Sequence, residues 1–279
     1  MIPRFLTAVL LLASTILAAA PAGAGQPAAR RIVALVPSLT EDLAALGVLD
    51  RVVGVSDFSD YPPAAKRIPV VASFASVATE QILALHPDVV VGIAAQRRAT
   101  EDLRRAGVDV VLVQDDDFPS VFANLHLLGT LVGREPQADA LIARLRARTQ
   151  ALVHSVPPRA HPPRVFVVLG VDPIFTVGSG SYIATLLALA GGRNATQARA
   201  PYVRSSAESL LADQPDLLIV DGAVGFGAVR DRTPWRELRA VREGRVATLR
   251  DPALLERPGP RYNEGLAWLI SVLRSVPAS

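Results

Sequence analysis

Few side chains in this chain have the types and the spacing that catalysis or metal binding requires. Cysteine is absent from all 279 residues, which excludes thiol nucleophiles, thiolate metal ligands and disulfides. No strand-like segment is followed by a dinucleotide-binding glycine motif, a phosphate-binding loop or a serine nucleophile elbow. The four histidines lack the spacing of a zinc site, and we expect them to be structural or solvated: they are His86, His126, His154 and His161. This inventory favours a protein that binds a ligand without transforming it.

One run of carboxylates, Asp115-Asp116-Asp117, suggests a calcium site, because Ca²⁺ prefers oxygen ligands. The run comes one residue after a strand-like segment, Val110 to Val113. We therefore interpret it as a polar loop at the edge of a binding cleft.

An internal repeat indicates the elements that position the polar residues. Residues 80–91 read EQILALHPDVVV and residues 208–219 read ESLLADQPDLLI, so that Glu80 and Glu208 each precede a proline, Pro87 or Pro215, by seven positions. The glutamate favours the start of a short helix, and the proline ends it. The apolar run that follows suits a strand of a parallel sheet with both faces covered.

The segments around both copies continue this alternation of strand and helix, which predicts an α/β fold with parallel sheets and right-handed crossovers. Around the first copy we expect strands at 31–36 and 110–113 and helices at 41–46 and 97–106. Around the second copy we expect strands at 164–169 and 246–249 and helices at 182–190 and 234–240. The prediction is two similar Rossmann-like lobes.

Residues 136–154 keep apolar side chains on one helical face and separate the two copies. A single helix of about 27 Å would be a stiff connector between the lobes, with a modest change of inter-lobe angle on ligand binding. The expected divisions are an N-terminal lobe at 25–134, the connector at 135–156 and a C-terminal lobe at 157–279. Ligands of open α/β sheets bind beyond the carboxyl ends of the strands, so the cleft should lie between the lobes.

The N-terminus predicts export. A basic start, an apolar run from Phe5 to Ala20 and a small-residue site ending at Ala24 are typical of a signal peptide over residues 1–24. Without cysteine there is no residue for a lipid anchor, so we expect a periplasmic protein that is not lipid-anchored. The net charge is only +3 and the arginines are interleaved with acids, which does not favour a nucleic-acid partner.

With these features, the chain resembles the helical-backbone (class III) periplasmic binding proteins of ABC importers, and within that class it is most similar to the vitamin B12 binders. The resemblance spans the whole mature chain. Its most specific stretches are 54–63 (GVSDFSDYPP), 174–178 (IFTVG) and 256–261 (ERPGPR).

The resemblance implies two sets of site residues. Aromatic side chains of both lobes would contact a corrinoid, with a polar pair closing one side of the cleft: Phe58, Phe74, Phe175 and Tyr202, with Asp251 and Arg257. Glu80 and Glu208 would meet arginines of the two permease subunits in the inner membrane. We expect a monomer without a cofactor.

Cleft positions that are tryptophan in the vitamin B12 binders are Phe74, Tyr202 and Ile93 here, which would leave a roomier or differently shaped cleft. A ferric siderophore or haem therefore stays open as the ligand, although the scarcity of histidine argues against haem. A different class of function, that of a metal-site protein or an enzyme on the same scaffold, also remains an open alternative.

Overall fold

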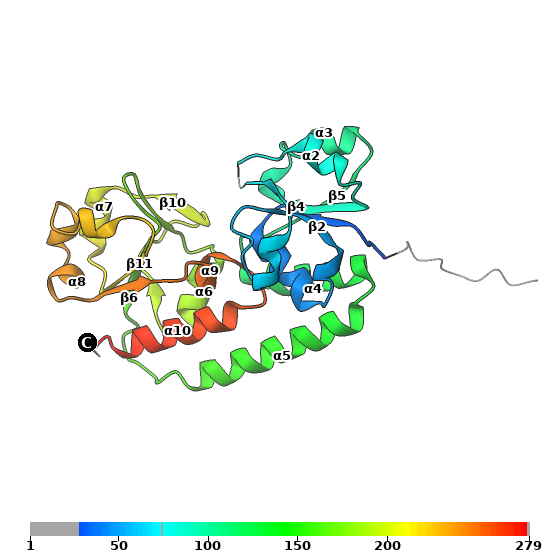
Figure 1. Ribbon diagram of the computed structural model, residues 1–279. Helices are drawn as coiled ribbons and strands as arrows, with labels where there is room; N and C mark the ends of the chain where they lie inside the picture. Colours follow the sequence, from blue (N-terminus) through cyan, green and yellow to red (C-terminus); the bar gives the residue numbers. More distant parts are fainter. Residues whose placement is uncertain (1–27, 74, 278–279) are drawn as a thin grey trace, which may run out of the picture.

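The computed structural model describes residues 28–73 and 75–277, which form two α/β lobes joined by a long helix (Figure 1). In this part of the chain the N-terminal lobe contains a parallel sheet with strand order β3-β2-β1-β4-β5. The predicted fold class is therefore confirmed. The strands are β1 (Ile32–Ala34), β2 (Val52–Ser56), β3 (Val70–Ala72), β4 (Val89–Ile93) and β5 (Asp109–Val113).

Both faces of this sheet are buried, which explains the uninterrupted apolar runs of its strands. Ile32 and Ala34 pack on one side against α1 and α4, whereas Val33 packs on the other side against α2 and α3. The predicted helix 97–106 is shorter in the structure, where only residues 101–105 are α-helical. The helices are α1 (Pro37–Ala45), α2 (Thr79–Ala84), α3 (Glu101–Arg105) and α4 (Phe118–Val132).

The C-terminal lobe contains a second parallel sheet, β12-β11-β6-β9, and an antiparallel sheet, β10-β8-β7, within the described residues. The antiparallel sheet was not expected from the sequence. The strands are β6 (Arg164–Val168), β7 (Gly170–Val171), β8 (Ile174–Val177), β9 (Arg193–Asn194), β10 (Tyr202–Arg204), β11 (Leu217–Asp221) and β12 (Val246–Leu249).

The prediction of one helix over 234–240 is wrong. A 3-10 turn, η5 (Trp235–Glu237), and the short α8 (Arg239–Arg242) are separated by Leu238, whose backbone is extended. Both Trp235 and Leu238 are buried in the core of this lobe, so tertiary packing overrides the local helical pattern. The other helices of the lobe are α6 (Tyr182–Leu189), α7 (Ala207–Asp213), α9 (Ala253–Glu256) and α10 (Tyr262–Arg274).

The sequence repeat has the same structural role in both lobes. Asp88 accepts a 2.9 Å hydrogen bond at Oδ2 from the backbone N–H of Arg31, and Asp216 accepts the same 2.9 Å bond from Arg164. The aspartate N–H groups return 2.8 Å bonds to the carbonyl oxygens of Arg31 and Arg164. The repeated Pro-Asp pair therefore joins β4 to β1 in one lobe and β11 to β6 in the other.

The connector helix α5 (Glu135–His154) runs along one side of both lobes and packs against α4 and α10 (Figure 1). One hydrophobic cluster contains Leu141 and Leu145 of α5, Val121 and Leu125 of α4, and the core of the C-terminal lobe. Because the lobes share packed side chains at this helix, a wide hinge motion would expose apolar surface.

None of the helices in the described segments combines the length and the apolar character needed to cross a bilayer. The predicted signal peptide, residues 1–24, lies outside the described residues and stays a prediction.

Candidate functional site

A cleft lies between the lobes, beyond the carboxyl ends of the parallel strands. Two adjoining cavities of about 500 and 560 Å³ form it, and they share lining residues from both lobes: Val36, Pro37, Asp221, Glu256 and Arg257. Val36 follows β1 and Asp221 ends β11, so both sheets contribute at their carboxyl ends. Each cavity has the size of a small-molecule site, and the two together would hold a bulky organic ligand.

Three of the predicted aromatic residues face this cleft. Phe58 lines one cavity and is 76% exposed, with a φ of +58° that is uncommon for an aromatic residue. Phe175 and Tyr202 line the other, with rings stacked at 6.2 Å between centroids and 11° between planes. Exposed aromatic faces held by the backbone in this way favour contact with a flat ligand.

Tyr202 belongs to a strand, β10. Its strand pairs antiparallel with β8, which aligns Tyr202 with Val177 and Arg204 with Phe175. This pairing places the two rings on one face of the sheet. Phe74 lies outside the described residues, so its predicted role stays a prediction.

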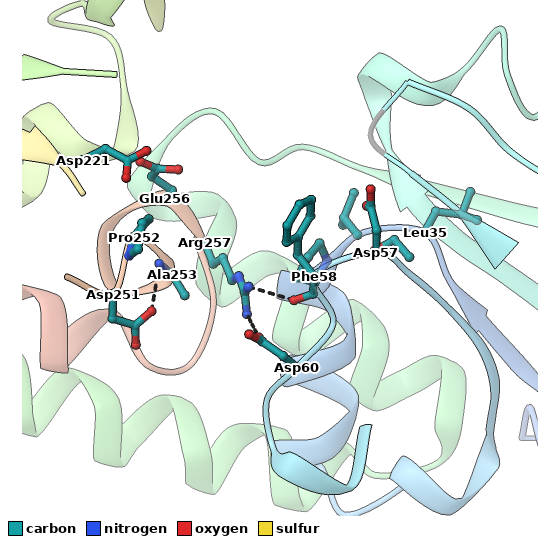
Figure 2. A pocket seen from close by; sticks show the side chains of 13 residues that line it. Leu35, Asp57, Phe58, Asp60, Asp221, Asp251, Pro252, Ala253, Glu256 and Arg257 are labelled. Atoms are coloured by element: carbon teal, nitrogen blue, oxygen red, sulfur yellow. Dashed lines mark hydrogen bonds and ion pairs between the residues drawn. The ribbon is translucent and has the colours of Figure 1, made fainter. Parts of the chain in front are cut away.

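Arg257 follows α9 and reaches across the cleft to the N-terminal lobe (Figure 2). Its Nη1 donates to Glu41 at 2.9 Å and to Asp60 at 2.8 Å, and its Nη2 donates to the carbonyl oxygen of Phe58 at 2.7 Å. Burial raises the pKa of Glu41 even though Arg257 opposes the shift. Burial alone would also raise the pKa of Asp60, but the hydrogen bond and charge of Arg257 lower it. Arg257 is thus an inter-lobe tie that also holds the Phe58 turn.

Asp251 and Arg257, which were predicted as a polar pair, line the same cavity but have different partners. The Asp251 carboxylate lies 3.3 Å from Arg261 Nη2. Arg261 also approaches the N-terminal lobe, where its guanidinium carbon lies 4.0 Å from the centroid of the Tyr61 ring and Nη1 lies 3.8 Å from Glu41.

Several acidic residues that line the cleft were not expected as site residues: Asp57, Asp60, Asp221 and Glu256. The buried Glu41, which binds Arg257, was not expected either. The sequence offered a signal for Asp57 and Asp221, since each lies at or directly after the end of a strand. The Asp115–Asp117 run was expected at the cleft edge, and Asp115 and Asp116 do line one cavity. Asp117 instead accepts a 2.9 Å bond from the N–H of Ser120 and caps α4.

Burial shifts the titration of two of these carboxyls. It raises the pKa of Glu256 to about 7, with a further contribution from the charge of Asp221. It raises the pKa of Asp115 to about 6, assisted by Asp116. Both pKa values therefore lie closer to neutral pH than those of ordinary carboxyl groups.

Replacing Glu256 by glutamine should change how stability depends on pH. The folded pKa is about 7 and the unfolded value about 4.5, so the folded chain binds the proton more tightly, and stability falls as pH rises between these values. We expect E256Q to exceed the wild type in unfolding free energy by about 1–2 kcal/mol at pH 8 and to match it at about pH 4, after allowance for solvent screening. Urea unfolding at both pH values measures this. Equal differences at the two pH values would contradict a raised pKa.

Glu80 and Glu208 occupy equivalent positions in the two lobes. Each lies in the first turn of a short helix, α2 or α7, and each is exposed. Their equivalence is structural as well as sequential, because each helix leads through the repeated Pro-Asp pair into a buried strand.

Within residues 28–73 and 75–277, no group of three or more His, Asp or Glu side chains is arranged to hold a metal ion.

The sequence profile described as "Periplasmic binding protein" matches residues 32–253, which is most of the chain. The chain belongs to the periplasmic binding protein family. It is 30% identical over 245 residues to an uncharacterized ABC transporter substrate-binding lipoprotein of Bacillus subtilis, covering 85% of this chain and 77% of that protein. It is also 30% identical over 198 residues to the vitamin B12-binding protein of Yersinia pestis, covering 70% of each.

A solved periplasmic heme binding protein from Pseudomonas aeruginosa has the same fold, with a TM-score of 0.79 and 29% identity over 90% of this chain and 95% of that one. This periplasmic binding protein is thus a substrate-binding protein of the ABC-transporter type with the class III fold. Relatives of comparable similarity are named for vitamin B12 and for heme, so the ligand must be argued from the chemistry of the cleft.

Proposed function

We propose that this periplasmic binding protein captures a corrinoid in the inter-lobe cleft and delivers it, unchanged, to the permease of an ABC importer. The observation that carries the proposal is the set of exposed aromatic faces at one cleft. Among the described residues, Phe58, Phe175 and Tyr202 are exposed large hydrophobic side chains contributed by both lobes. Such faces bury large areas of a macrocycle at low entropic cost.

The cleft is less suited to haem than to a corrinoid. Haem iron is held in proteins by His, Met, Cys or Tyr side chains. Among the described residues that line the two cavities, Tyr202 alone is of these types. Burial, together with the nearby Asp115, Glu256 and Asp116, raises the pKa of Tyr202 to about 12. Tyr202 would thus be the one candidate iron ligand among the described lining residues, whereas a corrinoid carries its own cobalt ligands and needs none from the protein.

Docking to the permease is proposed to use Glu80 and Glu208. Two exposed glutamates at equivalent positions of the two lobes match the arrangement that a permease with two similar subunits requires. Complementary charges of this kind set orientation and encounter rate more than affinity.

Removing the stacked aromatic pair should weaken ligand binding strongly. We expect F175A and Y202A each to lower the affinity for cyanocobalamin about 10-fold to 100-fold, because each deletes a large side chain that the ligand would bury. Isothermal titration measures the affinity. Leu127, which is 44% exposed like Tyr202 but lies on α4 outside both cavities, gives the control L127A, for which we expect no change.

The same titration tests the corrinoid assignment. Heat with cyanocobalamin, together with recovery of the intact ligand by chromatography, supports a binding protein that does not transform it. No heat with any corrinoid beside clear binding of haemin or a ferric siderophore would overturn the assignment.

A further inference from the structure

The cleft is lined by carboxylates and by almost no positive charge. The acidic residues of the two cavities come from both lobes: Asp57, Asp60, Asp115, Asp116, Asp221, Asp251 and Glu256. Arg257 is the one basic residue that lines either cavity in the described part of the chain. The whole chain has a net charge of +3, so the acidic cleft is not a consequence of overall composition.

Most of these carboxylates have no cation beside them. Asp60 pairs with Arg257 and Asp251 pairs with Arg261, but Asp57, Asp115, Asp116, Asp221 and Glu256 have no ion-pair partner among the described residues. The guanidinium of Arg257 is occupied by Glu41, Asp60 and the Phe58 carbonyl oxygen. The described lining residues therefore offer no free cation to an anionic ligand.

Glu256 and Asp221 lie next to each other in one cavity (Figure 2), and both also line the other cavity. Asp221 Oδ1 accepts a 2.8 Å bond from the N–H of Ala223. Glu256 Oε1 is buried and has no hydrogen-bond partner in the described segments. A buried acceptor without a partner costs free energy unless a bound molecule supplies a donor.

We infer that the cleft is built for a ligand that presents N–H donors or positive charge, and that it rejects polyanions. This inference rests on the proposed function only in locating the ligand in the inter-lobe cleft. The amide side chains around a corrin ring can donate N–H hydrogen bonds to the carboxylate oxygens of Glu256, Asp221, Asp115 and Asp116. The propionates of haem and the triple negative charge of a ferric catecholate siderophore would instead meet like charge in a partly desolvated site.

A pair of corrinoids that share one ring tests the inference. Cobinamide carries amides around the ring, whereas cobyrinic acid carries carboxylic acids at these positions and is a polyanion at neutral pH. We expect the wild type to bind cobinamide at least about tenfold more tightly than cobyrinic acid at low salt, and the difference in affinity to shrink as salt screens the charges.

The double variant D221N/E256Q should reduce this preference for cobinamide about tenfold. The double variant D115N/D116N should act in the same direction if the first variant fails to fold. Asp50 is exposed in the 3-10 turn η1 (Leu49–Arg51) outside both cavities, and D50N should leave the preference unchanged.

A second pair separates this inference from the corrinoid assignment. Ferrioxamine B is a cationic ferric siderophore, and ferric enterobactin is an anionic one. If no corrinoid binds but ferrioxamine B binds and ferric enterobactin does not, the corrinoid assignment fails and the charge inference stands. If cobyrinic acid binds as tightly as cobinamide, or if haemin or ferric enterobactin binds more tightly than both cobinamide and ferrioxamine B, the charge inference is overturned.

Discussion

Uptake through the cognate ABC importer should fall to background when Glu80 and Glu208 are both changed to alanine, while the affinity for ligand in the cleft stays unchanged. Both side chains are exposed and neither lines a cavity of the cleft, so their removal does not alter the ligand contacts. Each glutamate contributes under about 1 kcal/mol through its helix dipole, so both lobes should stay folded. The loss should come from docking, because complementary charge pairs orient the complex and speed its formation. Uptake of labelled ligand by cells, together with titration of the purified variant, measures the two effects separately.

The chain provides a matched control. Glu135 is also an exposed glutamate in the first turn of a helix, but that helix is the connector α5. E135A should leave uptake intact. The single variants E80A and E208A should give intermediate uptake, since each leaves one lobe able to dock. Normal uptake by the double variant would show that docking uses other residues.

Changing Arg257 to methionine should lower the free energy of unfolding by about 3 kcal/mol at pH 8, because it leaves a buried carboxylate without its partner. The side chain of Glu41 is only 2% exposed, and Arg261 remains as a more distant cation at 3.8 Å. The loss should be smaller at pH 5. Burial already raises the pKa of Glu41, and the absence of Arg257 raises it further, so this carboxyl becomes neutral as the pH falls. Urea unfolding at the two pH values measures the difference.

Two comparisons isolate the cause. The double variant E41Q/R257M should recover part of the lost stability, because the buried carboxylate is then neutral and the charge that loses its partner is that of Asp60, whose side chain is 52% exposed. Arg105 pairs with Glu101 and Asp102 on the surface and its side chain is 70% exposed, so R105M should cost under about 1 kcal/mol. Equal losses for R257M and R105M would mean that the inter-lobe tie does not stabilise the fold.

Helices and strands were predictable where the apolar pattern of a segment matches the way the segment is buried in the fold. Val89–Ile93 and Leu217–Asp221 are buried on both faces, so their unbroken apolar runs identified them as parallel strands. Trp235 and Leu238 show the opposite case, because their burial in the core requires an extended residue inside an otherwise helical stretch. The strand β10 was not predicted either, because it has only three residues, Tyr202–Arg204, and exists through its pairing with β8.

By itself, the sequence determined the two α/β lobes, the connector helix and the equivalence of Glu80 with Glu208, because spacing and apolar periodicity are local properties that each segment carries. Only the tertiary structure decided the character of the cleft. The contact between Arg257 and Glu41 joins residues 216 positions apart, and Asp221 and Glu256 approach Asp115 and Asp116 only because two separate sheets present their carboxyl ends to each other. The net charge of the cleft depends on which residues of the two lobes come together, and no local sequence pattern predicts that. The acidity of the site therefore follows from the packing of the two lobes.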